Sequence, residues 1–303
     1  MVRSGFDSRT GHYPAAYADR GPPGWPSLAK DRDRPGASHT QRPNDFLEFS
    51  MTERTIPVDT FGPIALDLTM NTGSIRIAVD PALTQARVVL TTEATSGPSA
   101  DAIRDTAVRL NGQNLKVRVP DVAGAMGGTT IRMGGNVYVS GNSGGKVFVN
   151  GREVTATGPA GSAVTPITAT VHLPAKSVAL ISTRTADTVV TGTLARLEYD
   201  GTSGALTAER VGDLDARATS GSVIVHEVTG PLDANLTSGN LSIGAYSGHA
   251  ARLNLTSGNV QMAATAQATG RLTVSATSGC ARITGASHLN VRRRVTSGYI
   301  QIS

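Results

Sequence analysis

The chain has 303 residues, carries 28 Lys and Arg against 23 Asp and Glu, and has a net charge of +5 at neutral pH. Aromatic residues make up only 4% whereas glycine is frequent, with 34 residues, so the composition favours short strands and tight turns over a helical bundle. The single cysteine, Cys280, excludes an intrachain disulfide, and no stretch reaches the roughly 18 apolar residues of a membrane-spanning helix.

Residues 1–50 differ in composition from the rest of the chain. Proline pairs and the charged run at residues 30–35 show neither a strand nor a helix period, which predicts disorder. Met51 is followed at once by an alternation of apolar and polar residues, and residues 5–9 match the reading of a tRNA T-arm as codons. The hypothesis is that residues 1–50 come from a misplaced start codon; a real disordered arm is the alternative.

Neither Met1 nor Met51 is followed by a charged segment and then an apolar one, as in a secretory signal peptide. We therefore expect a cytoplasmic protein. A location at the cell surface is the alternative, and it requires an export signal that these residues do not show.

Residues 51–172 predict an N-terminal β region. Branched residues favour a strand at 87–91, alternation favours a strand at 115–119, and residues 110–114 predict a turn. One short helix is predicted over residues 99–109. Its N-terminus would be capped by Ser99 or Asp101, and Ile103 and Val108 would point inward.

Residues 124–151 alternate glycine turns with short apolar segments at 137–139 and 147–149. This pattern predicts a β excursion on the main fold and not a separate domain. Within it, residues 141–146 place glycines beside Lys146, but the spacing of a phosphate-binding loop and a following helix are both missing. A turn that connects two strands is the favoured interpretation.

An internal repeat fills residues 173–303 and is centred on the tripeptide Thr-Ser-Gly. Its copies recur every 17 to 21 residues and end at Gly204, Gly221, Gly239, Gly258, Gly279 and Gly298. A degenerate copy has Asp187 at the glycine position, and an upstream copy ends at Gly73. We expect these glycines to form structural corners in a left-handed conformation, at a bend where a Cβ would clash.

Apolar residues keep fixed distances from the corner glycines. Two residues after each glycine come Val189, Leu206, Val223, Leu241, Val260, Ala281 and Ile300. Four residues after it come Thr191, Ala208, Val225, Ile243, Met262, Ile283 and Ile302. Seven residues before it come Leu197, Leu214, Leu232, Ala251, Leu272 and Val291.

Polar residues alternate with these columns, which predicts strands that are buried on one face. A single rung of about 19 residues cannot bury that face alone, whereas stacked rungs can. The predicted fold is therefore an all-β β-solenoid with Thr-Ser-Gly corners, in which residues 51–303 form one continuous domain.

Residues 218–225, Ala-Thr-Ser-Gly-Ser-Val-Ile-Val, and residues 236–243, Leu-Thr-Ser-Gly-Asn-Leu-Ser-Ile, resemble a bacterial family of β-strand repeats of unknown function, often labelled as adhesins. The resemblance covers residues 165–303 well and 55–90 more loosely. It implies a β-solenoid, and it supplies no established activity and no catalytic residues.

A carbohydrate-active β-helix enzyme would gather several carboxylates on one exposed face. Candidates are available, but they fall at mismatched rung positions, so solvated charges near loops are favoured: Asp213, Asp215, Glu227 and Asp233. The histidines share no metal-ligand spacing: His172, His226, His249 and His288. The serines before the corner glycines, such as Ser203 and Ser220, lack a nearby base. We expect no catalytic, cofactor or metal site, and we expect Cys280 to point outward.

Charge is unevenly distributed along the repeat. Residues 234–303 contain no Asp or Glu but six arginines, and Arg252 and Arg292 each lie six residues before a glycine, an outward position. The hypothesis is a basic C-terminal face that recognises an anionic polymer or a membrane surface through Arg252, Arg282, Arg292 and Arg294.

The last predicted strand, residues 299–303, leaves one edge of the solenoid unpaired, which favours pairing with a second copy of the chain. The expected function is accordingly a non-enzymatic binding or scaffolding protein that forms homo-oligomers through its C-terminal rung. A carbohydrate-active enzyme and a cell-surface adhesin are the alternatives.

Overall fold

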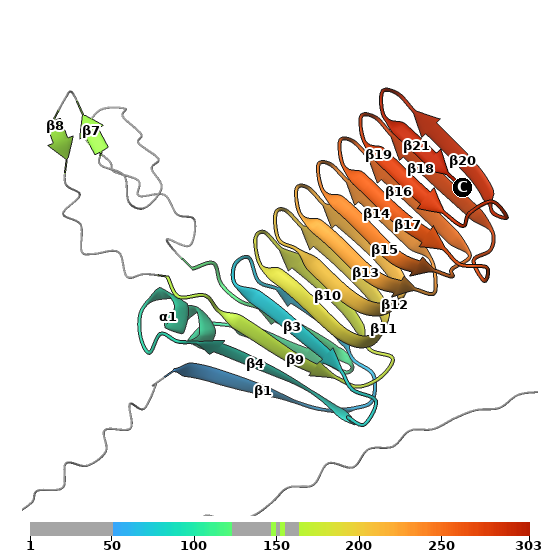
Figure 1. Ribbon diagram of the computed structural model, residues 1–303. Helices are drawn as coiled ribbons and strands as arrows, with labels where there is room; N and C mark the ends of the chain where they lie inside the picture. The colour runs from blue at the N-terminus through green and yellow to red at the C-terminus, as the bar shows by residue number, and fades with distance from the viewer. Residues whose placement is uncertain (1–50, 123–146, 150–151, 155–163) are drawn as a thin grey trace, which may run out of the picture. The chain divides into compact units, whose positions relative to one another are not determined.

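The computed structural model describes residues 51–122, 147–149, 152–154 and 164–303 (Figure 1). The predictions for residues 1–50, 137–139 and 141–146 lie outside the described residues. The strand predicted at 147–149 is confirmed as β7 (Val147–Val149), which pairs with β8 (Arg152–Val154) in a separate two-stranded sheet.

Two stacks of strands build the solenoid, and successive rungs lie side by side as parallel arrows in Figure 1. The first stack, the A sheet, consists of parallel neighbours with antiparallel β5 (Ala107–Asn111) at its edge. Its order is β6 (Asn114–Arg118), β2 (Ala65–Thr69), β10 (Val178–Thr183), the second halves of β11 (Asp187–Gly201) and β12 (Leu206–Ala218), β14 (Leu232–Leu236), β16 (Ala250–Leu255), β18 (Arg271–Ala276) and β20 (Asn290–Val295).

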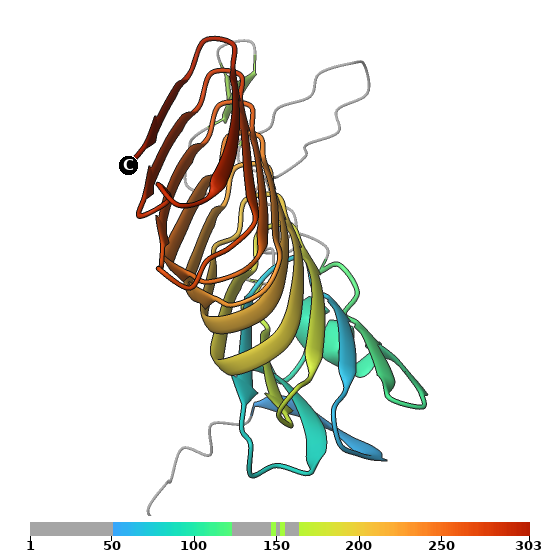
Figure 2. The same cartoon turned by 90° about the vertical axis from the view of Figure 1, so that its right-hand side faces the viewer.

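The second stack, the B sheet, continues each rung after its corner. Its order is β9 (Thr168–Leu173), β3 (Ser74–Val79), the first halves of β11 and β12, β13 (Ser222–Val228), β15 (Asn240–Tyr246), β17 (Asn259–Ala264), β19 (Cys280–Thr284) and β21 (Tyr299–Ile302). Two antiparallel strands extend it beside β9: β4 (Gln85–Thr92) and β1 (Thr52–Phe61). Viewed at 90°, each rung is a flattened coil (Figure 2).

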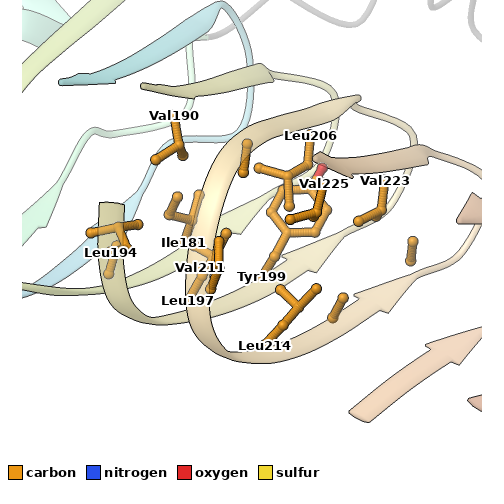
Figure 3. Close-up of a cluster of buried hydrophobic side chains, with 14 of the residues drawn as sticks. Ile181, Val190, Leu194, Leu197, Tyr199, Leu206, Val211, Leu214, Val223 and Val225 are labelled. Carbon is orange, nitrogen blue, oxygen red and sulfur yellow. The ribbon is translucent and has the colours of Figure 1, made fainter. Parts of the chain in front are cut away.

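The predicted interior columns are confirmed from Leu206 onward. Leu241 pairs with Val260, which pairs with Ala281 and then Ile300, and all four side chains are buried. On the A sheet the column runs from Leu197 through Leu214 to Val291. Figure 3 shows Leu197 and Leu214 of the A sheet in one buried cluster with Leu206 and Val223 of the B sheet. Apolar burial of this kind is the main stabilising contribution to the fold.

The degenerate rung was predicted one residue out of register. Thr188 pairs with both Ile75 and Leu206, so Ala186, and not Asp187, occupies the corner glycine position. Thr188 is consequently buried, at 1% exposure, while Val189 is 43% exposed. A shift of one residue reverses every side chain of a strand between its two faces.

The corner glycines are required for a different reason from the one predicted. Among them only Gly73 has a positive φ, 109°, so the left-handed conformation is wrong for the six Thr-Ser-Gly copies. A Cβ at Gly258 would instead lie 2.1 Å from the carbonyl oxygen of Gly239 in the preceding rung. Gly221, Gly239, Gly279 and Gly298 meet the preceding corner in the same way, at 2.1 to 2.4 Å. The corners form a column in which backbone stacks directly on backbone.

The excursion leaves the solenoid at a corner of the first rung. Val119 donates its N–H to the carbonyl of Thr69 (3.0 Å), and Ser74 donates its N–H to the carbonyl of Ile167 (2.9 Å). The chain therefore leaves β6 at Val119 and returns at Ile167, on either side of the corner that residues 70–73 cross in the next rung. An insertion at a corner interrupts no strand pairing.

The predicted helix is confirmed but shorter, as α1 (Pro98–Arg104). Its N-terminus has no side-chain cap: Ser99 instead donates its hydroxyl to the carbonyl of Thr165 (2.7 Å). Ile103 points inward as expected and is fully buried, whereas Val108 lies in β5. The turn expected at 110–114 joins β5 to β6, with Gly112 at φ 59°.

Candidate binding face

The outward side chains of the A sheet form a continuous surface, which we call the A face; the outward side of the B sheet is the B face. One column of the A face holds the residues six positions before each corner. In rung order it contains Lys116, Asp67, Leu180, Glu198, Asp215, Asp233, Arg252, Thr273 and Arg292. The column thus changes from carboxylates to arginines between Asp233 and Arg252.

The A face is hollowed at two places. A hollow of about 670 Å³ spans the change of charge, and its polar lining includes Asp213, Asp215, Asp233, Arg252 and Arg271. A second hollow of about 500 Å³ lies between the adjacent column and the corners. Asn235, Asn254, Ser275, Thr256, Thr277 and Arg294 line it. Both are open depressions in a sheet surface and not enclosed pockets.

The structure corrects in part the view that the four carboxylates fall at mismatched rung positions, because Asp215 and Asp233 share one column. Glu198 pairs with Asp215, and Asp215 pairs with Asp233, so three carboxylates stack in one column. Asp213 lies in the neighbouring column of the same hollow, and only Glu227 is on the B sheet. The sequence signal was present, because all three stacked residues lie six positions before a corner glycine.

The four arginines of the predicted basic face are divided between two surfaces. Arg252, Arg292 and Arg294 lie on the A face. Arg252 and Arg292 share one column, and Arg294 lies in the next outward column, two residues further along β20. Arg282 lies in β19 and belongs to the B face. Arg271, at the start of β18, lines the larger hollow beside Arg252 and was not among the predicted residues. Arg271 lies eight residues before Gly279, and residues an even number of positions before a corner glycine point outward. This offset is the signal that could have identified Arg271.

Acids and arginines neutralise each other in the middle rungs but not in the last ones. Arg217 lies 3.1 Å from Asp215, Arg196 pairs with Glu198, and Arg210 lies 2.6 Å from Glu227 on the B sheet. Arg252, Arg271, Arg292 and Arg294 are exposed, and none of them forms an ion pair with another residue in the described part of the chain. The A face therefore ends in uncompensated positive charge.

The pKa of the Asp215 carboxyl is raised. Burial raises its pKa from the ordinary 3.8, the Arg217 guanidinium lowers it, and the neighbouring carboxylates of Asp233 and Glu198 raise it further. Its Oδ1 is buried without a hydrogen-bond partner among the described residues. The carboxylate column is thus electrostatically strained, and protonation of Asp215 relieves that strain.

Amide side chains continue the polar surface between the two hollows. Asn254 donates from Nδ2 to Oδ1 of Asn235 (2.9 Å), and Asn235 donates from Nδ2 to Oδ1 of Asp233 (2.9 Å). Stacked asparagines of this kind hold their side chains in fixed orientations at the spacing of the rungs. Exposed threonines flank them at the corners: Thr237, Thr256, Thr277 and Thr296.

Other candidates are dispersed. Within residues 51–122 and 164–303, no group of three His, Cys, Asp or Glu side chains is arranged to hold a metal ion. His288 hydrogen-bonds the carbonyl of Ala268 at 2.9 Å, and Cys280 is exposed on the B face as predicted. No helix among the described residues is long and apolar enough to cross a membrane.

Comparison with known proteins agrees with this architecture. A family model described as Toastrack DUF4097 matches residues 68–303. No curated protein matches the chain. The chain is similar to a solved candidate adhesin from Bacteroides fragilis (11% identity, TM-score 0.49) and to one from Parabacteroides distasonis (12%, 0.46). It is also similar to a candidate lipid-binding protein from Parabacteroides distasonis (14%, 0.38). Each alignment covers 84% of this chain and 97% of the other.

Proposed function

The chain belongs to the Toastrack DUF4097 family, and from that premise we propose that it is a non-enzymatic binding or scaffolding protein whose A face recognises an anionic partner. One observation carries the proposal. Arg252, Arg271, Arg292 and Arg294 share this face, and none of them forms an ion pair with a carboxylate of the described residues.

The spacing of these arginines suits a partner with repeated anionic groups. Arg252 and Arg292 occupy one column two rungs apart, with Thr273 between them. Since rungs are about 4.8 Å apart, the two side chains originate about 10 Å from each other. Guanidinium groups bind carboxylate, sulfate and phosphate through paired hydrogen bonds, and several such contacts together give useful affinity.

Retention of the full-length chain on a heparin column, and sedimentation with vesicles containing phosphatidylglycerol, test the proposal. The variant R252S/R271S removes two charges from the A face, and R76S/R282S removes two from the B face. We expect about a tenfold loss of affinity for the first variant, equivalent to about 1.4 kcal/mol, and little change for the second. Equal effects of the two variants would refute recognition by the A face.

One observation favours a carbohydrate-active enzyme as the second candidate: Asp213, Asp215 and Asp233 line a single hollow. Neighbouring rungs place carboxylates about 5 Å apart, close to the separation in retaining glycosidases. Asp215 is, however, engaged with Arg217, and Asp233 with Asn235. Release of reducing sugar from a panel of polysaccharides, abolished in D215N and D233N, would support the enzyme. We expect no release.

A further inference from the structure

We propose that the anionic partner is a polyhydroxylated polymer, an acidic polysaccharide, that lies along the A face across several rungs. This inference rests on the proposed function, since it takes the arginines as the anion-binding groups. It adds the chemistry of the second hollow, which carries few charges and many hydrogen-bonding side chains.

The two hollows meet along adjacent columns of the same strands. Arg252 and Asn254 are outward neighbours on β16, Thr273 and Ser275 on β18, and Arg292 and Arg294 on β20. Asn254, Ser275 and Arg294 line the second hollow, while Arg252 and Thr273 line the first. A chain that crosses these rungs therefore meets guanidinium groups and amide or hydroxyl groups within two adjacent columns, side by side on β16 and on successive strands elsewhere.

The amide and hydroxyl groups suit ligand hydroxyls. A sugar hydroxyl both donates and accepts, and Asn, Ser and Thr side chains do the same. The hydrogen bond from Asn254 to Asn235 fixes both amides before a ligand arrives, so little side-chain entropy is lost on binding. A pre-oriented ladder that repeats with the rungs matches a polymer that repeats with its sugar units.

The A face lacks the groups that other polyanions require. Stacking of bases needs exposed aromatic side chains, and membrane binding gains from exposed apolar ones. Among the described residues, the large exposed hydrophobic side chains are Met51, Phe61, Leu110, Val189, Ile224, Val295 and Tyr299. Val295 is the only one of these within the stacked A-sheet rungs, and it pairs with buried Ala276 in an inward column. Nucleic acids and lipid surfaces are therefore less suited to this face.

The test compares three soluble polymers by titration calorimetry with the full-length chain. Polygalacturonate offers carboxylates and hydroxyls, poly-glutamate offers carboxylates alone, and neutral galactan offers hydroxyls alone. We expect polygalacturonate to bind about tenfold more tightly than poly-glutamate of equal charge, and galactan not to bind measurably.

Two double variants distinguish the contribution of the hydrogen-bonded asparagines from that of the arginines. N235A/N254A removes the hydrogen-bonded pair of amides on the A face, and N240A/N259A removes the matching pair on the B face, where Asn259 donates to Asn240 at 3.0 Å. We expect the first variant to lose the preference for polygalacturonate while it keeps its affinity for poly-glutamate, and the second to behave as the wild type. T256V/T277V, which preserves side-chain shape, provides the same test if N235A/N254A unfolds.

The outcomes distinguish the inference from the function on which it rests. Equal affinity for polygalacturonate and poly-glutamate would overturn the inference, whereas the proposal of an anionic partner would still hold. Failure to bind either polymer, heparin or phosphatidylglycerol vesicles would overturn the proposed function as well. Tighter binding of single-stranded DNA or of phosphatidylglycerol vesicles than of polygalacturonate would also overturn the inference.

Discussion

Thr185 donates both its backbone N–H (2.8 Å) and its hydroxyl (3.1 Å) to the carbonyl oxygen of Asn71, a residue 114 positions earlier in the chain. The two residues belong to corners of neighbouring rungs, so the upstream Asn-Thr-Gly copy and the degenerate copy stack directly. The rung formed by β2 and β3 therefore stacks on the rung that begins with β10, and the excursion lies within the first rung, between β6 and β9.

Shortening the excursion tests this arrangement. The deletion variant joins Val122 directly to Val164. Residues 120–122 and 164–166 then connect β6 to β9 across the corner, where residues 70–73 make the same connection in the next rung. We expect the free energy of unfolding to change by less than about 1 kcal/mol, because loop length has a weak effect on stability. Urea unfolding followed by circular dichroism measures it, and loss of the cooperative transition would contradict the arrangement.

The corner column predicts a large cost for a single methyl group. G258A places a Cβ 2.1 Å from the carbonyl oxygen of Gly239, so two rungs must separate locally. We expect a loss of at least about 3 kcal/mol in the free energy of unfolding, as for severe overpacking. Urea unfolding measures this loss.

Gly112 provides the matched control, since its φ is positive and no atom lies within 4 Å of the position that a Cβ would occupy. G112A should cost only about 1 kcal/mol, from backbone strain alone. Equal losses for G258A and G112A would show that conformation, and not contact between rungs, requires the corner glycines.

Arg54 supports the C-terminus of α1. Its Nη1 donates to the carbonyl oxygens of Ile103 (3.1 Å), Arg104 (2.7 Å) and Thr106 (2.8 Å). We expect R54A to lower the free energy of unfolding by about 2 kcal/mol, since charged hydrogen bonds to helix-end carbonyls are lost. Thermal unfolding measures the loss. The exposed Arg87 on β4 is the control, and an equal effect of R87A would contradict the assignment.

Asp215 predicts a pH dependence of stability. Its folded-state pKa is raised above 3.8, mainly by burial, so the native state binds more protons than the unfolded state around that pH. Stability contributed by the protonated form is present at low pH and is lost as pH rises through the folded-state pKa. D215N removes this loss.

We therefore expect the free energy of unfolding of D215N to increase relative to the wild type between about pH 3 and pH 7. Chemical denaturation of D215N and of the wild type at the two pH values measures how the difference between their free energies of unfolding changes with pH. S275A on the same face, with no titratable group, should show no such change. A relative decrease for D215N would mean that the ion pair with Arg217 outweighs burial.

The sequence alone was sufficient to predict the repeat and most of its interior. Leu241, Val260 and Ile300 stand at one offset from glycine, and a period of two places them inward. The same rule failed at the degenerate corner, because Thr188 is a polar residue in an inward position and Val189 an apolar residue in an outward one. Hydrogen bonds to Gly73 and neighbouring corners, which alternation does not reveal, set that register.

The candidate site was predictable only in part. Runs of charge along the sequence indicated a basic end. The chain passes from the A sheet to the B sheet at each corner, however, so Arg282 and Arg292, which the charge pattern assigned to one surface, lie on different faces. Counting offsets separates them, and it also brings Glu198, Asp215 and Asp233 together. The hollows depend on the curvature of the sheet and on side-chain size, which no local pattern encodes.

Arginine footprinting tests the central claim most directly. The full-length chain is treated with phenylglyoxal with and without polygalacturonate, and the modified positions are read by mass spectrometry. We expect the polymer to protect Arg252, Arg271, Arg292 and Arg294 on the A face and to leave Arg76 and Arg282 on the B face reactive. Protection of Arg282 equal to that of Arg271, or protection of neither, would contradict recognition by the A face.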